Sequence, residues 1–141
     1  MQARPLYIFT GAQIVAVVGV LWYVFSWPSP WDLQRSAGVA LLLVGYAGIA
    51  TARYYLGKSF ALRPEAHQLV TRGIYSKIRN PIYVFGLIAI AGLVLVLHRP
   101  LLWLFLPVIV ALQTLRARRE AQVLEAAFGD TYREYRRKTW F

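Results

Sequence analysis

The chain has 141 residues, of which 58% are hydrophobic, and its 16 Lys and Arg against 6 Asp and Glu give a formal net charge of +10. A soluble domain of this length could not cover so much apolar surface, so the composition excludes an ordinary soluble globular protein. The sequence contains no cysteine, which excludes disulfides and thiolate metal sites.

Four apolar segments predict transmembrane helices, at 5–27, 36–56, 81–97 and 100–128. Each has a run close to the roughly 17 to 25 residues that cross a hydrocarbon core, and the last extends beyond it. No small-residue cleavage site follows the first run, so we expect that helix to be retained. The sequence therefore predicts a single all-α integral membrane domain over 1–141.

Small residues in the second predicted helix indicate how it packs. Gly45, Gly48 and Ala52 have the spacing that lets helix backbones approach closely in a membrane. Ordinary bundle packing accounts for them, and we assign them no role in a functional site.

The third and fourth predicted helices form a tight hairpin, because His98-Arg99-Pro100 is the only polar break between them. The fourth helix accepts Pro100 in its first turn and continues to a natural stop at Gly129, so about a third of it projects into the cytoplasm. Arg116 and Glu120 share a face of this projection. An isolated salt bridge at the helix exit is the alternative explanation for that pair.

Basic residues are distributed unevenly, and this predicts the orientation in the membrane. Only Arg35 and Arg99 lie on one side; the other fourteen flank the opposite side, at Arg4, Arg53, Lys58, Arg63, Arg72, Lys77, Arg79, Arg116, Arg118, Arg119, Arg133, Arg136, Arg137 and Lys138. Both termini and the 58–80 connection are therefore expected in the cytoplasm. This topology and attraction to anionic lipids account for the net charge, so no nucleic-acid partner is expected. His67 and His98 fall on opposite faces and could not share a metal ion, so no metal is expected either.

A short interfacial helix is predicted over 130–141, after the helix stop. Asp130 is expected to cap it, and it carries Tyr132 and Tyr135 among basic residues. Anchoring at the membrane surface and a part in a site are both compatible with these tyrosines.

The connection 58–80 is the predicted ligand-binding segment. The last part of the connection and the start of the third helix together read HQLVTRGIYSKIRNPIY (67–83). Asn80 is expected to cap the third helix and Pro81 to occupy its first turn, with Tyr83 facing the opening at that helix start. Unpaired amides at a helix start favour an electron-rich group, such as part of an adenosine-type ligand. The alternative is a loop that is basic for topology alone.

Two blocks of sequence resemble a known family. HQLVTRGIYSKIRNPIY is similar to the His-x-Leu-Val, Gly-x-Tyr, Arg-His-Pro-x-Tyr signature of isoprenylcysteine carboxyl methyltransferases and their relatives, which include phospholipid N-methyltransferases. RARREAQVLEAAFGDTYREY resembles the second block of that family, Arg-x-x-x-Glu followed by Phe-Gly-x-x-Tyr-x-x-Tyr. The resemblance implies an integral membrane methyltransferase without a Rossmann domain, which uses S-adenosylmethionine and releases S-adenosylhomocysteine.

The resemblance also implies roles for particular residues. Arg116 matches the basic residue that meets the substrate, and Asn80 stands where the family usually has His. The positions that match cofactor-binding residues of the family are His67, Gln68, Leu69, Val70, Tyr75, Asn80, Pro81, Ile82, Tyr83 and Glu120. We therefore predict a cytoplasmic cofactor pocket built from the connection, the start of the third helix and the projection of the fourth.

The methyl acceptor is expected to be lipidic or prenylated and to enter sideways from the bilayer. A carboxylate is already ionised at neutral pH and needs no general base, so O-methylation of an isoprenylcysteine-like carboxyl group is the first hypothesis, with Arg116 orienting that group. N-methylation of an aminolipid is the second. The third is a membrane protein that retains the fold without catalysis.

Overall fold

The structure is a computed structural model that describes residues 4–28, 30–57 and 69–141. These residues form helices and contain no β-strand, which confirms the predicted all-α class. The elements in chain order are α1 (Arg4–Ser26), α2 (Leu33–Leu56), the 3₁₀ helix η2 (Gly73–Ser76), α3 (Pro81–Leu97), the 3₁₀ helix η3 (Pro100–Leu104), α4 (Phe105–Phe128) and α5 (Asp130–Lys138).

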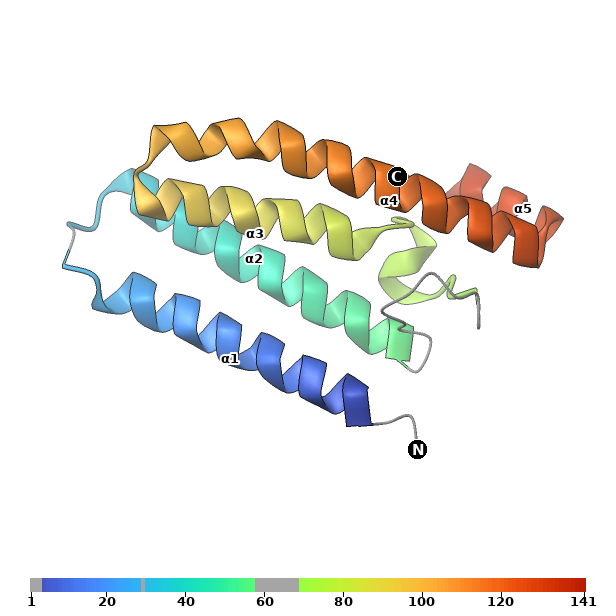
Figure 1. Ribbon diagram of the computed structural model, residues 1–141, viewed down its shortest axis with the longest axis horizontal. Helices are drawn as coiled ribbons and strands as arrows, with labels where there is room; N and C mark the ends of the chain where they lie inside the picture. Colours follow the sequence, from blue (N-terminus) through green and yellow to red (C-terminus); the bar gives the residue numbers. More distant parts are fainter. Residues whose placement is uncertain (1–3, 29, 58–68) are drawn as a thin grey trace.

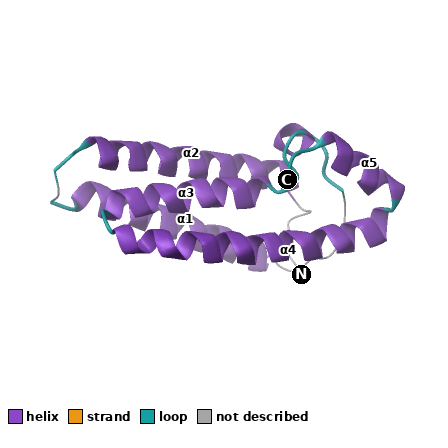
Figure 2. Ribbon diagram, turned by 90° about the horizontal axis from the view of Figure 1, so that it is seen from above, coloured by secondary structure: helices purple, strands orange, loops and turns teal. Residues whose placement is uncertain are grey.

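The helices are arranged as an elongated bundle in which α2 and α3 lie side by side (Figure 1). The α1 helix lies on the outer side of α2, and α4 runs along α3 and continues past the start of that helix (Figure 1). Figure 2 shows the same projection from a second direction, with α5 folded back beside it. The projecting part of α4, α5 and η2 thus gather at one end of the bundle.

Close packing of α2 against α3 depends on small residues. A Cβ atom added at Gly45 would lie 2.7 Å from the backbone nitrogen of Ala89, and one at Gly38 would lie 2.7 Å from the carbonyl oxygen of Gly92. Ala52 is fully buried. The predicted bundle-packing role of this stripe is therefore confirmed, and the core cluster beside it consists of Val24, Val39, Leu42, Ala89 and Val96.

The start of α2 differs from the prediction by three residues. The helix begins at Leu33 because the Asp32 carboxylate accepts a 2.7 Å hydrogen bond from the backbone N–H of Arg35 and so caps the first turn. Arg35, predicted to lie just before this helix, is inside its first turn and is 1% exposed. The prediction that the helix begins at residue 36 was therefore wrong, because it left Arg35 in the preceding turn.

The hairpin between α3 and α4 is formed largely as predicted. The α3 helix spans the expected 81–97 and is followed by its C-cap residue His98, which adopts a left-handed conformation with φ 52°. The segment from Pro100 opens with the 3₁₀ helix η3 rather than with α-helix, and α4 then continues to Phe128. Gly129, with φ 51°, ends α4 as predicted.

The C-terminal segment differs from the predicted helix over 130–141. The α5 helix ends at Lys138, and Trp140 then forms a parallel bridge with Ile78, in which the Trp140 N–H donates to the carbonyl of Lys77 at 2.7 Å. The N-cap position of α5 belongs to Gly129, whereas Asp130 forms an ion pair with Arg133 at 3.0 Å. The predicted cap at Asp130 is therefore wrong, because that carboxylate already lies inside the helix.

Among the residues that the structure describes, two helical segments are long and apolar enough to cross a membrane, Leu33–Leu56 and Pro100–Phe128. The described helices also include two shorter apolar segments, Gly11–Ser26 and Pro81–Leu97. Large apolar side chains of α4 are exposed, including Phe105 at 61% and Leu112 at 62%. An exposed apolar surface of this kind is stable when it contacts the hydrocarbon core of a bilayer.

Candidate functional site

The start of α3 provides a fixed platform at the projecting end of the bundle. Pro81 is fully buried at the first helical position, as predicted. The Asn80 carbonyl accepts hydrogen bonds from the backbone N–H groups of Tyr83 at 3.1 Å and Val84 at 3.2 Å. The Asn80 side chain forms no capping bond, so the predicted side-chain cap is wrong although the cap position is right. Its amide is therefore not committed to holding the helix.

Three predicted residues meet where α4 passes the start of α3. The Tyr83 hydroxyl donates to Oε1 of Glu120 at 2.5 Å, and Nε of Arg116 donates to the same oxygen at 3.2 Å. The Arg116 guanidinium carbon also lies 5.9 Å from the centre of the Tyr83 ring. We call these three residues the Tyr83–Glu120–Arg116 cluster. It combines an anion, a cation and an aromatic face in one place.

Exposure within this cluster is graded. The Glu120 side chain is 29% exposed and the Arg116 side chain is 60% exposed. Among the described residues, none donates a hydrogen bond to Oε2 of Glu120, and the terminal nitrogens of Arg116 form no ion pair. The cluster therefore retains one carboxylate oxygen and the planar end of one guanidinium with which a ligand can bond.

The segment before α3 is held in place by glycine and by α5. Gly73 has φ 61°, which favours glycine, and any side chain there would overlap the ring of Tyr55. Tyr75, in η2, is 7% exposed, and its carbonyl accepts a 2.7 Å hydrogen bond from the hydroxyl of Tyr135. Burial raises the pKa of Tyr75, and Tyr135 and Glu120 raise it further. Tyr75 is therefore a neutral, buried neighbour of the cluster at physiological pH.

The two tyrosines of α5 are buried. Tyr132 is 3% exposed and Tyr135 is 9% exposed, so they pack inside the protein instead of anchoring it at a membrane surface. Burial raises the pKa of Tyr135 to about 12, with a further contribution from Tyr132. Tyr135 turns inward because the backbone of η2 supplies a hydrogen-bond acceptor for its hydroxyl, which an interfacial helix would lack.

Of the remaining predicted site residues, three are described by the structure and two are not. Ile82 is half-buried beside Pro81 in the first turn of α3, and Leu69 and Val70 are half-buried in the segment that precedes η2. His67 and Gln68 lie outside the described residues. The structure thus brings Tyr75, the start of α3 and the cluster to one end of the bundle.

Two residues near the cluster were not predicted. Gln113 of α4 faces Gly86 of α3, where an added Cβ would lie 3.9 Å from its amide nitrogen, and its carbonyl oxygen is buried without a hydrogen-bond partner in the described structure. Arg79 has a buried Nε that likewise lacks one, and burial raises the pKa of Tyr132 while the charge of Arg79 offsets part of that rise. In the sequence, Gln113 is a lone amide in an apolar helix and Arg79 is a charge just before a helix start. These two features could have identified both residues as candidates.

Within the described residues, no group of three or more His, Cys, Asp or Glu side chains is placed to hold a metal ion.

Comparison with protein families matches residues 33–131 to the family described as phospholipid methyltransferase. Neither a curated protein nor a solved structure matches the chain. The match includes α2, α3, α4 and the Tyr83–Glu120–Arg116 cluster, and it extends over more than half of the sequence. The chain is thus a membrane protein that belongs to the phospholipid methyltransferase family.

Proposed function

We propose that this protein transfers a methyl group from S-adenosylmethionine to the head group of a membrane lipid, at the end of the bundle where α4 passes the start of α3. The observation that carries this proposal is the contact of Tyr83, Glu120 and Arg116, which unites the two sequence blocks in one cluster. When bound, S-adenosylmethionine supplies an electrophilic methyl group on a sulfonium, and the protein supplies alignment.

The residues present fit such a cofactor. Oε2 of Glu120 is available to accept hydrogen bonds from ribose hydroxyls or from the amino group of the methionine part. The ring of Tyr83 already lies beside one cation, and the same kind of aromatic face attracts a sulfonium. The proposed cofactor contacts are those predicted from the sequence, His67, Gln68, Leu69, Val70, Tyr75, Asn80, Pro81, Ile82, Tyr83 and Glu120.

An aminophospholipid is the first candidate acceptor, because its amine is the methylated group that the family description fits best. Gln113 lies one helical turn from Arg116 on α4, toward the apolar part of the bundle. Its buried carbonyl oxygen is an acceptor that an amine N–H group could satisfy. An amine must lose a proton before it attacks, so the rate is expected to rise with pH through the pKa of that amine.

A carboxylate, such as that of an isoprenylcysteine, is the second candidate acceptor. The exposed guanidinium end of Arg116 favours it, since guanidinium binds carboxylate through two parallel hydrogen bonds. This acceptor is ionised at neutral pH, so its methylation is expected to be independent of pH above about 6.

Membrane topology completes the proposal. We propose four spans, with both termini and the cluster on the cytoplasmic side, because fourteen basic residues flank that side. The acceptor would enter laterally, past Gly86 and Gln113, with its acyl chains still in the bilayer. This arrangement gives a reason for a small methyltransferase to be built from membrane helices.

Two measurements test the function. Calorimetric titration of the detergent-solubilised protein with S-adenosylmethionine is expected to show saturable binding, and no heat at millimolar ligand would reject the enzyme hypothesis. Incubation with methyl-labelled cofactor and separate aminophospholipid and prenylcysteine acceptors then identifies the lipid that becomes labelled. A rate that rises with pH supports the amine, whereas a flat profile supports the carboxylate.

A further inference from the structure

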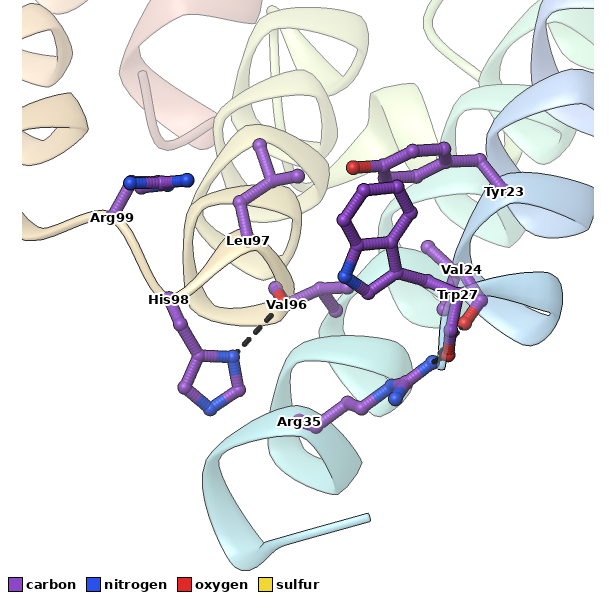
Figure 3. Close-up of a pocket in the computed structure, with 8 residues that line it drawn as sticks. All are labelled: Tyr23, Val24, Trp27, Arg35, Val96, Leu97, His98 and Arg99. Atoms are coloured by element: carbon purple, nitrogen blue, oxygen red, sulfur yellow. Dashed lines mark hydrogen bonds between the residues drawn. The ribbon is translucent and has the colours of Figure 1, made fainter. Parts of the chain in front are cut away.

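A second polar site lies at the other end of the bundle, where α1 ends, α2 begins and α3 ends. It is a partly open cavity of about 240 Å³ (Figure 3) lined by Tyr23, Val24, Trp27, Arg35, Val96, Leu97, His98 and Arg99. Along α3, Leu97 lies fourteen positions after Tyr83, which corresponds to about 21 Å at 1.5 Å per residue. The cavity is therefore separate from the Tyr83–Glu120–Arg116 cluster.

Hydrogen bonds between helix ends hold the walls of this cavity. Nη2 of Arg35 donates to the backbone carbonyl of Val24 and, at 3.1 Å, to that of Trp27, which ties α2 to the end of α1. Nε2 of Gln34 donates to the carbonyl of Leu95 at 3.0 Å, which ties α2 to the end of α3. These bonds fix the walls of the cavity, so little ordering is needed for binding.

His98 contributes a positive charge to this end of the bundle. Its Nε2 lies 2.8 Å from Oδ2 of Asp32, and its Nδ1 lies 3.0 Å from the carbonyl oxygen of Val96. Both partners are acceptors, so both ring nitrogens must donate, and the imidazole is cationic when both bonds are formed. The hydrogen bond to Asp32 is the main reason that the pKa of His98 is raised.

The polar groups that line the cavity are donors. Arg99, the phenol of Tyr23 and the indole N–H of Trp27 can donate to a ligand, and no carboxylate is among the lining residues. Arg35 and His98 contribute positive charge while they hydrogen-bond to the backbone of Val24, Trp27 and Val96 and to Asp32. The nearby Asp32 is already paired with His98. The apolar part of the wall comes from Val24, Val96 and Leu97. Such a lining favours an anion that is attached to an apolar chain.

The position of the cavity indicates the source of that anion. It lies at the ends of apolar helices, and Tyr23 and Trp27 are 41% and 55% exposed there, as aromatic side chains are at a membrane interface. A guanidinium group such as that of Arg99 binds phosphate oxygens through charge-assisted hydrogen bonds. We propose that this cavity binds the phosphate group of an anionic phospholipid, in the leaflet opposite the Tyr83–Glu120–Arg116 cluster.

Lipid titration of the full-length protein tests this proposal. The protein in a neutral detergent is titrated with phosphatidylglycerol, phosphatidylcholine or inorganic phosphate, and binding is followed by the unfolding midpoint and by native mass spectrometry. Phosphatidylglycerol is expected to bind saturably and to raise the midpoint, whereas phosphatidylcholine binds more weakly. Equal binding of both lipids would overturn the proposal. Inorganic phosphate that binds as well as the lipid would replace the lipid by a soluble anion and overturn it too.

Substitution of Arg99 locates the binding. Arg99 lies in an exposed turn, so Arg99→Gln is expected to keep the fold. An ion pair made by an exposed side chain contributes about 1 kcal/mol, so this variant is expected to bind phosphatidylglycerol about five-fold more weakly. Arg99→Lys should retain most of the affinity, and Arg118→Gln, at the other end of the bundle, should leave it unchanged.

An unchanged affinity in Arg99→Gln, or an equal loss in Arg118→Gln, would overturn the assignment to this cavity. Binding is measured without cofactor or methyl acceptor. A failure of lipid binding is therefore distinguishable from a failure of methyl transfer.

Discussion

The hydroxyl of Tyr83 donates a 2.5 Å hydrogen bond to the carboxylate of Glu120, although 37 positions separate the two residues in the sequence. This bond joins the first turn of α3 to the part of α4 that projects past it. The same carboxylate oxygen also accepts a hydrogen bond from Nε of Arg116. A side chain that organises two helices in this way is the natural point to test by mutation.

Glu120→Gln is expected to weaken S-adenosylmethionine binding about ten-fold or more, because a hydrogen bond to a charged group contributes about 1.5–3 kcal/mol. Calorimetric titration in detergent measures the dissociation constant. Glu134→Gln is the matched control, since Glu134 is exposed on α5 and pairs with Lys138. Unchanged affinity in a folded Glu120→Gln variant would contradict a cofactor contact at this position.

Arg116→Ala distinguishes the two acceptor classes. If the acceptor is a carboxylate, kcat/KM is expected to fall about ten- to hundred-fold, the effect of removing one charge-assisted contact of about 1.5–3 kcal/mol. Arg116→Lys should recover part of that loss. With an amine acceptor, Arg116→Ala should reduce kcat/KM little.

The control for Arg116 is Arg119→Ala, an exposed basic residue on the same helix. Initial rates at varied acceptor concentration, together with the cofactor dissociation constant, separate the outcomes. A loss of cofactor binding as large as the loss of rate would show that Arg116 acts through Glu120 instead of on the acceptor.

Gly45→Ala is expected to lower the free energy of unfolding by about 1–3 kcal/mol, because the new Cβ would force α2 away from the backbone of α3. Gly19→Ala in α1 is the control. A Cβ at Gly19 meets open space among the described residues, and Ala has the higher helix propensity. Thermal unfolding in detergent compares the two variants, and equal midpoints would contradict close α2–α3 contact at Gly45.

Tyr135→Phe removes the hydroxyl that bonds the carbonyl of Tyr75. Because this leaves a buried carbonyl without its donor, the free energy of unfolding is expected to fall by about 1–3 kcal/mol. Tyr132→Phe is the control, since no described residue accepts a hydrogen bond from the Tyr132 hydroxyl. A similar loss in both variants would show that ring packing, and not the hydrogen bond, holds η2.

The ion pair of His98 with Asp32 predicts a dependence of stability on pH. The pKa of His98 is raised above its ordinary 6.5, first by the hydrogen bond to Asp32, and the pKa of Asp32 is lowered from 3.8, first by the backbone N–H of Arg35 and then by His98. The His98 contribution is complete below pH 6.5 and is lost as pH rises through the raised value. The Asp32 contribution is complete above pH 3.8 and is lost as pH falls through the lowered value.

The stabilisation by this pair is therefore greatest between about pH 4 and 6.5. Unfolding midpoints from pH 4 to 9 measure it. Asp32→Asn keeps a side chain that can cap α2 but removes the charge, so the decline of the midpoint above pH 6.5 should flatten. The same decline in that variant would assign it to other groups.

Several features of the fold could be predicted because they depend on local properties of the chain. Pro81 and Gly129 mark helix ends through their own backbone preferences, and Gly45 marks a close helix contact through its lack of a side chain. The i,i+4 spacing of Arg116 and Glu120 places them on one helix face in any α-helix, and the structure confirms their contact. The three-residue error at the start of α2 arose because the Asp32 side chain caps that helix.

By itself, the sequence determined an all-helical membrane protein, the hairpin of α3 and α4, and two polar blocks with a family resemblance, since composition, periodicity and backbone preference act over a few residues. Only the tertiary structure decided that Tyr135 turns inward onto η2, that Trp140 pairs beside Lys77, and that Arg35 is buried at the opposite end. Each of these depends on a hydrogen-bond partner contributed by another element. No local pattern specifies such a partner, because it comes into reach only when the helices have packed.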